Sequence, residues 1–303
     1  MLNRRSLLVA AALLVSAAPA FAQDKLNIVA SFSILGDFVK NVGGDRVNVS
    51  TLVPPGGDAH VYTPTPADAR RIAEAKLVVV NGLGFEGWLS RLVKASGSKI
   101  AVVTATAGIK PRKLPGDHHG HSHGHSHDEA DPHAWQSVAN VKTYVANIRE
   151  ALIAADGAGA AVYRANADAY LAELDKLDRE VKDAVAKLPA ERRKVISTHD
   201  AFGYFAGAYG ITFIAPQGVS TESEASAKDI AAIIRQIKAQ KIPAVFLENV
   251  TDPRLMRRIA SETGAAVGGT LYSDSLTDEK GDAPTYIGMV RHNIKALTSA
   301  LTN

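Results

Sequence analysis

The stretch AGAAVYRANADAYLAELDKLDREVKDAVAKL, residues 158–188, decides how the chain is organised. Its apolar residues recur at steps of three and four, the spacing that places side chains on one face of an α-helix. They are Tyr163, Ala167, Tyr170, Leu174, Leu177, Val181, Val185 and Leu188. A helix of about 30 residues is roughly 45 Å long, enough to run along a whole domain or to link two. We therefore predict one long amphipathic helix over 158–188.

The segments on both sides of this helix alternate short apolar runs with helical patterns. The predicted strands cover 26–30, 47–53, 77–80, 100–103, 195–198, 211–215, 244–248 and 265–271. The predicted helices cover 33–42, 67–75, 88–95, 137–155, 227–240 and 286–301. Strands that alternate with helices indicate parallel sheets covered by helices. The predicted fold is α/β, with two parallel-sheet lobes, 23–157 and 189–303, bridged by one long rigid α-helix, 158–188.

The first 22 residues have the features of a secretory signal peptide. Arg4 and Arg5 precede an apolar run at 7–18, and Ala20-Phe21-Ala22 forms a small-x-small cleavage pattern. The apolar run is too short to span a bilayer. The chain contains no cysteine, so we expect neither disulfides nor a cysteine-linked lipid anchor. We predict a soluble periplasmic protein.

The charge balance argues against some classes of partner. The formal net charge is +3, and the signal segment holds two arginines and no acidic residue, which leaves +3 − 2 = +1 after cleavage. A nearly neutral chain has no general electrostatic attraction for nucleic acid or an anionic membrane. We therefore expect no nucleic-acid partner.

Six of the ten histidines lie in one polar segment, 117–131, which interrupts the alternation of strands and helices. They are His118, His119, His121, His123, His125 and His127. The segment has too few apolar residues to build a core, and His-rich tracts bind metal at least weakly. We predict a loop that collects metal ions with the help of its acidic residues, including Asp131. A hydrophilic linker without function is the alternative interpretation.

Three other histidines and two carboxylates sit in loops, most of them next to predicted strands. His60 ends the turn at 54–60, His199 follows the strand at 195–198, and His133 follows Asp131-Pro132. Asp274 and Glu248 lie at the ends of later strands. In open parallel sheets, ligands bind beyond the carboxyl ends of the strands. A histidine at a strand end is also a common hydrogen-bonding residue, so the residues alone leave a metal site and a structural role open.

Three neighbouring residues have simpler interpretations. Asp200 directly follows His199, and we expect it to cap the next helix. We expect Trp135 to be a packing residue that also helps to exclude water beside His133. The remaining histidine, His292, lies between Arg291 and Asn293 on the predicted last helix, where we expect it to be solvated.

Four motifs resemble those of the metal-specific solute-binding proteins of bacterial ABC importers, which take up zinc or manganese. The motifs are GGDAHVY at 56–62, DPHAW at 131–135, STHDAF at 197–202 and YSD at 272–274. Their order and spacing and the His-rich segment before the second motif also resemble that family, over the whole mature chain. The resemblance implies two α/β lobes bridged by a rigid helix, with the metal ligands at His60, His133, His199 and Asp274.

The histidine at the third motif resembles the zinc binders of this family, because manganese binders usually have glutamate there. Three imidazoles and one carboxylate suit tetrahedral Zn²⁺, whereas Mn²⁺ prefers more oxygen donors. The resemblance thus implies a monomer, not an enzyme, that delivers Zn²⁺ to the permease of an ABC importer in the inner membrane. A periplasmic zinc metallochaperone is a further partner class to consider.

Three alternative functions stay open from the sequence. The first is the binding protein of a manganese or iron importer, and the second is a periplasmic zinc buffer without a transporter. The third is a zinc hydrolase, since three histidines and an open position form a catalytic pattern. Against the hydrolase, the implied fourth ligand Asp274 fills that position, and the sequence lacks an HExxH-type general base.

Overall fold

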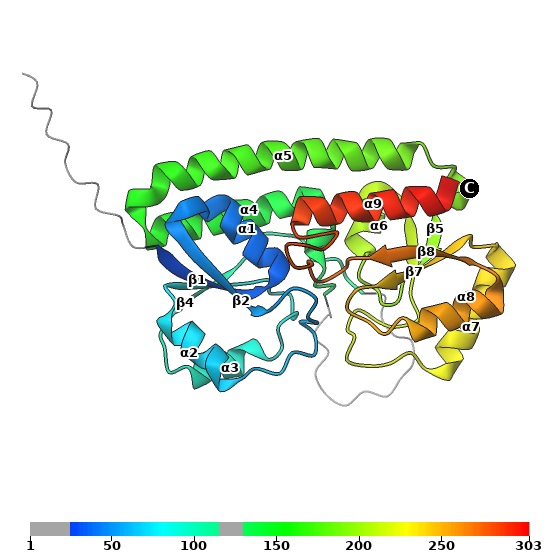
Figure 1. The fold of residues 1–303 in the computed structure, drawn as a ribbon, viewed down its shortest axis with the longest axis horizontal. Helices are drawn as coiled ribbons and strands as arrows, with labels where there is room; N and C mark the ends of the chain where they lie inside the picture. The colour runs from blue at the N-terminus through cyan, green and yellow to red at the C-terminus, as the bar shows by residue number, and fades with distance from the viewer. Residues whose placement is uncertain (1–24, 115–129, 303) are drawn as a thin grey trace, which may run out of the picture.

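The computed structural model describes residues 25–114 and 130–302 as two α/β lobes that lie side by side beneath the long helix α5, Ala160–Ala186 (Figure 1). Within these residues the first lobe holds a parallel sheet of strand order β2-β1-β3-β4. Its strands are β1 Leu26–Phe32, β2 Val47–Val53, β3 Leu77–Val80 and β4 Ala101–Thr104. Helices α1 (Ser33–Gly43) and α4 (Val138–Ala155) cover one face, and α2 (Pro66–Glu74) and α3 (Leu89–Ala95) lie on the other.

The second lobe repeats this arrangement with the parallel order β6-β5-β7-β8. Its strands are β5 Lys194–Ile196, β6 Thr212–Ile214, β7 Ala244–Glu248 and β8 Ala266–Leu271. Its helices are α6 Gly203–Tyr209, α7 Ala227–Gln240, α8 Arg254–Thr263 and α9 Tyr286–Thr302. In each lobe the first strand, β1 or β5, lies inside the sheet. The second strand of the lobe pairs with one side of it and the third strand with the other, so the strand order reverses there. That reversal is the place where open α/β sheets bind ligands.

Helix α5 buries the face that its spacing predicts. The seven predicted apolar positions from Tyr163 to Val185 are all buried, and Leu188 is buried just beyond the helix end. The helix is two residues shorter than predicted at each end; Pro189, which disfavours helical backbone in the residue before it, follows Leu188. It packs on α1 and α4 of the first lobe and on α6 and α9 of the second. The predicted bridge between two parallel-sheet lobes is confirmed.

The two lobes share most of their core. One cluster of buried apolar side chains continues from the first sheet, through α5, to the inner face of the second lobe. A smaller cluster, which includes Ile233, Ile237, Met256 and Ile259, lies between β7 and the outer helices α7 and α8. Burial of apolar surface is the main stabilising term of a fold. The shared cluster therefore holds the lobes in a fixed relation along the side of α5.

The residue pattern did not locate two short helices. It indicated helices between the later strands but placed only the one at 227–240, and α6 and α8 were missed. Helix α6 has seven residues, and α8 buries only Met256, Ile259 and Ala260. Such short or largely polar helices give little periodic signal.

Part of the sequence predictions falls outside the described residues. These are the signal segment 1–22 and the six histidines between 118 and 127. Among residues 25–114 and 130–302, no helix is long and apolar enough to cross a membrane. The lobe boundaries at 157 and 188 stay predictions.

Candidate metal centre

Three histidines and one aspartate from four separate loops meet between the lobes. His60 follows β2, His133 precedes α4, His199 follows β5 and Asp274 follows β8. One ligand atom from each lies within 4.8 Å of all the others. Every one of these loops except that of His133 extends a strand beyond its carboxyl end, so the parallel sheets aim them at the same cleft.

The distances between these donor atoms match those around a single small ion. The Nε2 atoms of His60 and His133 are 3.2 Å apart, and Nε2 of His199 lies 3.0 Å from Oδ2 of Asp274. Nε2 of His60 lies 3.3 Å from the same oxygen. Nitrogen donors 2.0–2.1 Å from a tetrahedral Zn²⁺ would be about 3.3 Å from one another. The four donors can therefore share one ion without a large rearrangement.

Asp131 orients the ring of His133. Its Oδ1 lies 2.8 Å from Nδ1 of His133 and accepts a hydrogen bond of 3.0 Å from the backbone N–H of the same residue. Its Oδ2 accepts from Arg112 at 2.9 Å. A carboxylate on Nδ1 holds the proton there and leaves the Nε2 lone pair for a metal. Asp131 is fully buried, so in this structure its carboxylate serves His133, and the expected help to the His-rich loop at 117–131 stays a prediction.

Glu248 has the same relation to His199. Its Oε2 lies 2.6 Å from Nδ1 of His199, and its Oε1 accepts hydrogen bonds from the backbone N–H groups of Thr198 and His199 at 2.7 and 3.0 Å. The sequence marked Glu248 as a further candidate ligand. The structure places it behind the histidine, outside the group of four donors, where it fixes both the ring and the backbone of His199.

His60 is held differently. Its backbone N–H donates to Oδ1 of Asp58 at 2.9 Å, and its ring lies edge-on to Phe85 with centroids 4.7 Å apart. The turn before it reaches the second lobe, where Gly56 N–H donates to the carbonyl of Leu276 at 2.9 Å. Gly56 has φ 77°, a left-handed conformation that glycine adopts without strain. His60 is also the one of the four that lines a cavity described below, whereas the other three are fully buried.

The charges at this centre are arranged to hold a cation. Burial disfavours the charged form of His133, but Asp274 and Asp131 outweigh it and raise its pKa to about 9. Burial likewise opposes protonation of His199, yet Glu248 and Asp274 raise its pKa well above the usual value. Asp274 is buried too, and these two rings nevertheless hold its pKa well below the usual value. Protons therefore occupy the metal-free centre, and a metal ion has to displace them.

Two side chains of the first lobe clamp the loop of Asp274. Trp135 Nε1 and Gln136 Nε2 both donate to the carbonyl of Ser273, at 2.9 and 2.7 Å. The Trp135 ring is fully buried and lies 5.2 Å from the ring of His133. The buried ring agrees with the expected packing role of Trp135, and the exclusion of water stays a prediction. Gln136 was not singled out from the sequence, because nothing in its local pattern marks an amide that reaches the other lobe.

Two expectations about nearby residues are wrong. Asp200 does not cap α6, which begins at Gly203 without a side-chain cap; its carboxylate lies 3.7 Å from Nη1 of Arg112 instead. His292 is half-buried rather than solvated. Its Nε2 lies 3.1 Å from the carbonyl of Thr270, and its ring packs on Tyr272, because α9 lies against β8.

Comparisons with known proteins agree with this architecture. Residues 28–300 match the family model described as zinc-uptake complex component A, periplasmic. The chain is 36% identical over 279 residues to the manganese-binding lipoprotein MntA of Halalkalibacterium halodurans, which covers 92% of this chain and 89% of that protein. It is 33% identical over 293 residues to the iron-binding protein YfeA of Yersinia pestis, covering 96% and 91%.

A solved structure shows the same fold. The periplasmic zinc-binding protein TroA of Treponema pallidum matches with a TM-score of 0.84 at 33% identity, over 91% of this chain and 99% of that one. The family match extends over nearly the whole described chain, and the two-lobe architecture with its bridging helix is shared. The chain therefore belongs to the family of periplasmic zinc-uptake component A proteins, the metal-binding solute-binding proteins of ABC transporters.

Proposed function

We propose that this protein binds one Zn²⁺ tightly and delivers it to the permease of an ABC importer. The proposed ligands are His60, His133, His199 and Asp274. The observation that carries the proposal is the donor set itself: three imidazole nitrogens and one carboxylate at the spacing of a tetrahedral site. Two of the rings have carboxylates on Nδ1, an arrangement that raises the basicity of metal-bound histidines.

A second candidate cargo is Mn²⁺ or Fe²⁺. It is favoured by the relatives, two of which carry the names manganese-binding and iron-binding. Against it, a site with three nitrogen donors suits Zn²⁺ better than Mn²⁺, and at such sites Mn²⁺ and Fe²⁺ bind more weakly than Zn²⁺. Residue 199 is the position to change in a test between the two cargoes, because its histidine supplies one of the three nitrogen donors.

Competition between Zn²⁺ and Mn²⁺ on the untagged, metal-stripped protein tests the cargo. We expect one tight equivalent of Zn²⁺ that a large excess of Mn²⁺ does not displace. In the His199→Glu variant an oxygen donor replaces a nitrogen, so the ratio of Zn²⁺ affinity to Mn²⁺ affinity should become smaller. A parent protein that keeps Mn²⁺ against equimolar Zn²⁺ would contradict the zinc proposal. The same titration on a variant lacking 118–127 should lose only weak equivalents, which we assign to the loop histidines.

The proposed site leaves little room for catalysis. A catalytic zinc keeps one coordination position open for water or substrate, whereas here four protein donors converge. Zinc-dependent hydrolytic turnover would instead favour a hydrolase. A zinc buffer differs in having no transporter, so zinc uptake by cells that lack only this protein separates a buffer from an importer component.

We infer that the protein acts as a monomer in the periplasm, loaded from free zinc or from a zinc metallochaperone. The inference of export rests on the pattern of residues 1–22, and that of an unanchored protein on the absence of cysteine from the sequence. Release of the protein by osmotic shock, with its N-terminus at Gln23, is the expected result.

A further inference from the structure

A loop of the second lobe, residues 217–225, reaches over the cleft between the lobes. Within its own lobe it is attached by backbone hydrogen bonds, from Gln217 to the carbonyl of Thr198 and from Asp200 to the carbonyl of Gly218. Residues of the loop line two cavities. One has a volume of about 500 Å³ and is lined by Thr221 and by Asp58 of the first lobe. The other, of about 470 Å³, is lined by Ser220 and His60.

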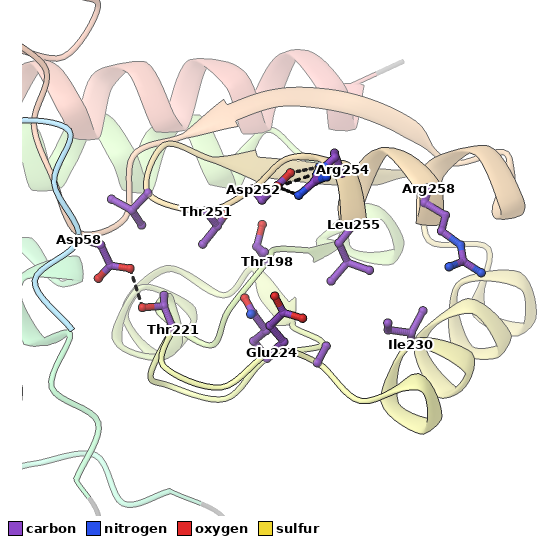
Figure 2. A pocket seen from close by; sticks show the side chains of 13 residues that line it. Asp58, Thr198, Thr221, Glu224, Ile230, Thr251, Asp252, Arg254, Leu255 and Arg258 are labelled. Atoms are coloured by element: carbon purple, nitrogen blue, oxygen red, sulfur yellow. Dashed lines mark hydrogen bonds and ion pairs between the residues drawn. The ribbon is translucent and has the colours of Figure 1, made fainter. Parts of the chain in front are cut away.

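One side-chain hydrogen bond ties this loop to the first lobe. Thr221 Oγ1 donates to Oδ2 of Asp58 at 2.6 Å, and Figure 2 shows the two side chains meeting across the cleft. The other oxygen of Asp58 accepts from the backbone N–H of His60 at 2.9 Å. A single carboxylate thus holds both the loop of the second lobe and the backbone of a proposed metal ligand.

We propose that Asp58 and Thr221 form a latch over the metal centre, and that this latch sets the rate at which metal leaves. Both are positioning residues, because neither belongs to the group of four donor atoms. Breaking the latch removes this bond between the loop and the first lobe, and it leaves Asp58, whose other oxygen holds the backbone of His60, without its partner in the second lobe. The proposal rests on His60 being a ligand, as proposed above.

The rest of the centre stays in place when the latch opens. His133 is held by Asp131, His199 by Glu248 and the loop of Asp274 by Trp135. None of these contacts involves Asp58 or Thr221. The latch therefore changes access and the hold on one ligand, while the other three donors stay fixed.

The test measures zinc release from the full-length protein after mixing with an excess of a strong chelator. Thr221→Val keeps the shape of the side chain and removes the donor, and Thr221→Ser keeps the donor. Hydrogen bonds to a charged acceptor are among the stronger ones, so we expect Thr221→Val to release zinc about tenfold faster. Thr221→Ser should stay within about twofold of the parent.

Thr298→Val is the matched control. Thr298 is also a half-buried threonine of the second lobe, but its hydroxyl donates to the carbonyl of Ile294 within α9. Its loss should leave the release rate unchanged. Asp58→Asn combined with Thr221→Val should accelerate release by less than the product of the two separate effects, because both changes act on one bond.

Zinc stoichiometry, measured first, keeps this test separate from that of the proposed function. A parent protein without a tight equivalent would refute the proposed function itself. If the parent and Thr221→Val each bind one equivalent and release it at the same rate, the latch is wrong and the function stands. Release from Thr221→Ser as fast as from Thr221→Val would equally overturn the latch, since the hydroxyl would then have no effect.

Discussion

The buried side of the metal centre and its edge at the cleft are held in different ways. On the buried side, His133 and His199 are fully enclosed, and each has a carboxylate on its Nδ1. At the edge, His60 lines a cavity and is held by a backbone hydrogen bond and by the face of Phe85. A carboxylate on Nδ1 fixes the direction in which the Nε2 atom of the ring points. The backbone hydrogen bond of His60 fixes mainly the position of its main chain.

This difference shows where the centre can change without losing its structure. A buried carboxylate that loses its partner is costly, so Asp131 and Glu248 keep their rings in place whether or not metal is present. The ring of His60 carries no such charge pair on Nδ1 within the described residues, and His60 lines a cavity. We infer that metal enters and leaves past His60, while the buried side keeps its geometry.

The largest effect should come from removing a ring on the buried side. His199→Ala deletes a donor and leaves Asp274 and Glu248 buried without the ring between them. A structural zinc site with four ligands binds its ion with roughly 10–16 kcal/mol, so the loss of one donor should lower zinc affinity about 1000-fold. For His60→Ala we expect a loss about tenfold smaller, because water from the cavity can replace the lost nitrogen. Competitive titration with a chelator of known affinity measures both, and equal losses would refute the contrast between the two sides.

A smaller effect is expected from a carboxylate behind a ring. Glu248→Gln keeps the size of the side chain but removes its charge, so it holds His199 less firmly. Changes of this kind typically cost about 10- to 100-fold in metal affinity. The matched control is Glu222→Gln, which changes an exposed acid that lines the cavity beside His60. The same titration should find the control close to the parent; a comparable loss in both would mean that overall charge, not the orientation of the ring, matters.

The smallest change in zinc affinity should come from a change of pH by one unit. The raised pKa of His133, about 9, means that the metal-free protein holds a proton there at neutral pH, and the pKa of His199 is raised as well. These charge pairs stabilise the metal-free fold fully below the unfolded histidine pKa of about 6.5, and the contribution of His133 is lost as pH rises through about 9. Zinc displaces the protons, so its affinity should rise about tenfold per pH unit for each proton displaced.

Calorimetry in buffers with different ionisation enthalpies counts the protons released. We expect at least one per zinc ion at pH 7. Binding without proton release at that pH would show that the buried rings are already neutral, and the electrostatic contrast between the two sides of the centre would not hold.

The sequence predicted the features of this protein that depend on local periodicity. The spacing from Tyr163 to Val185 located the buried face of α5, and the apolar run 244–248 coincides with β7. The position of His199 directly after a strand, with the resemblance of its motif, identified it as a candidate donor. The structure then brought it together with Asp274, 75 residues away in the chain.

The contacts around the donors could not be predicted in this way. Glu248 lies at the end of a strand, as a ligand would, and only the pairing of β5 with β7 places it behind His199. Asp131 sits beside a His-rich tract, which suggested a role in that tract, and only the folded structure shows its buried contact with His133. The bond from Thr221 to Asp58 joins residues 163 apart. Such contacts depend on how distant segments and the two lobes pack together. A periodic pattern along the chain does not predict this packing.

Tyr286, at the start of α9, has a consequence for the order in which the protein can form. The residue comes late in the chain, yet it is fully buried against the first lobe: its backbone N–H donates to Asp37, its hydroxyl donates to the carbonyl of Trp135, and its ring packs on Phe38. A chain that emerges from a ribosome or a translocation channel with its N-terminus first therefore lacks a central piece of its first lobe until the last helix follows. The first lobe reaches its complete packing only after α9 has emerged, when almost the whole chain has been released.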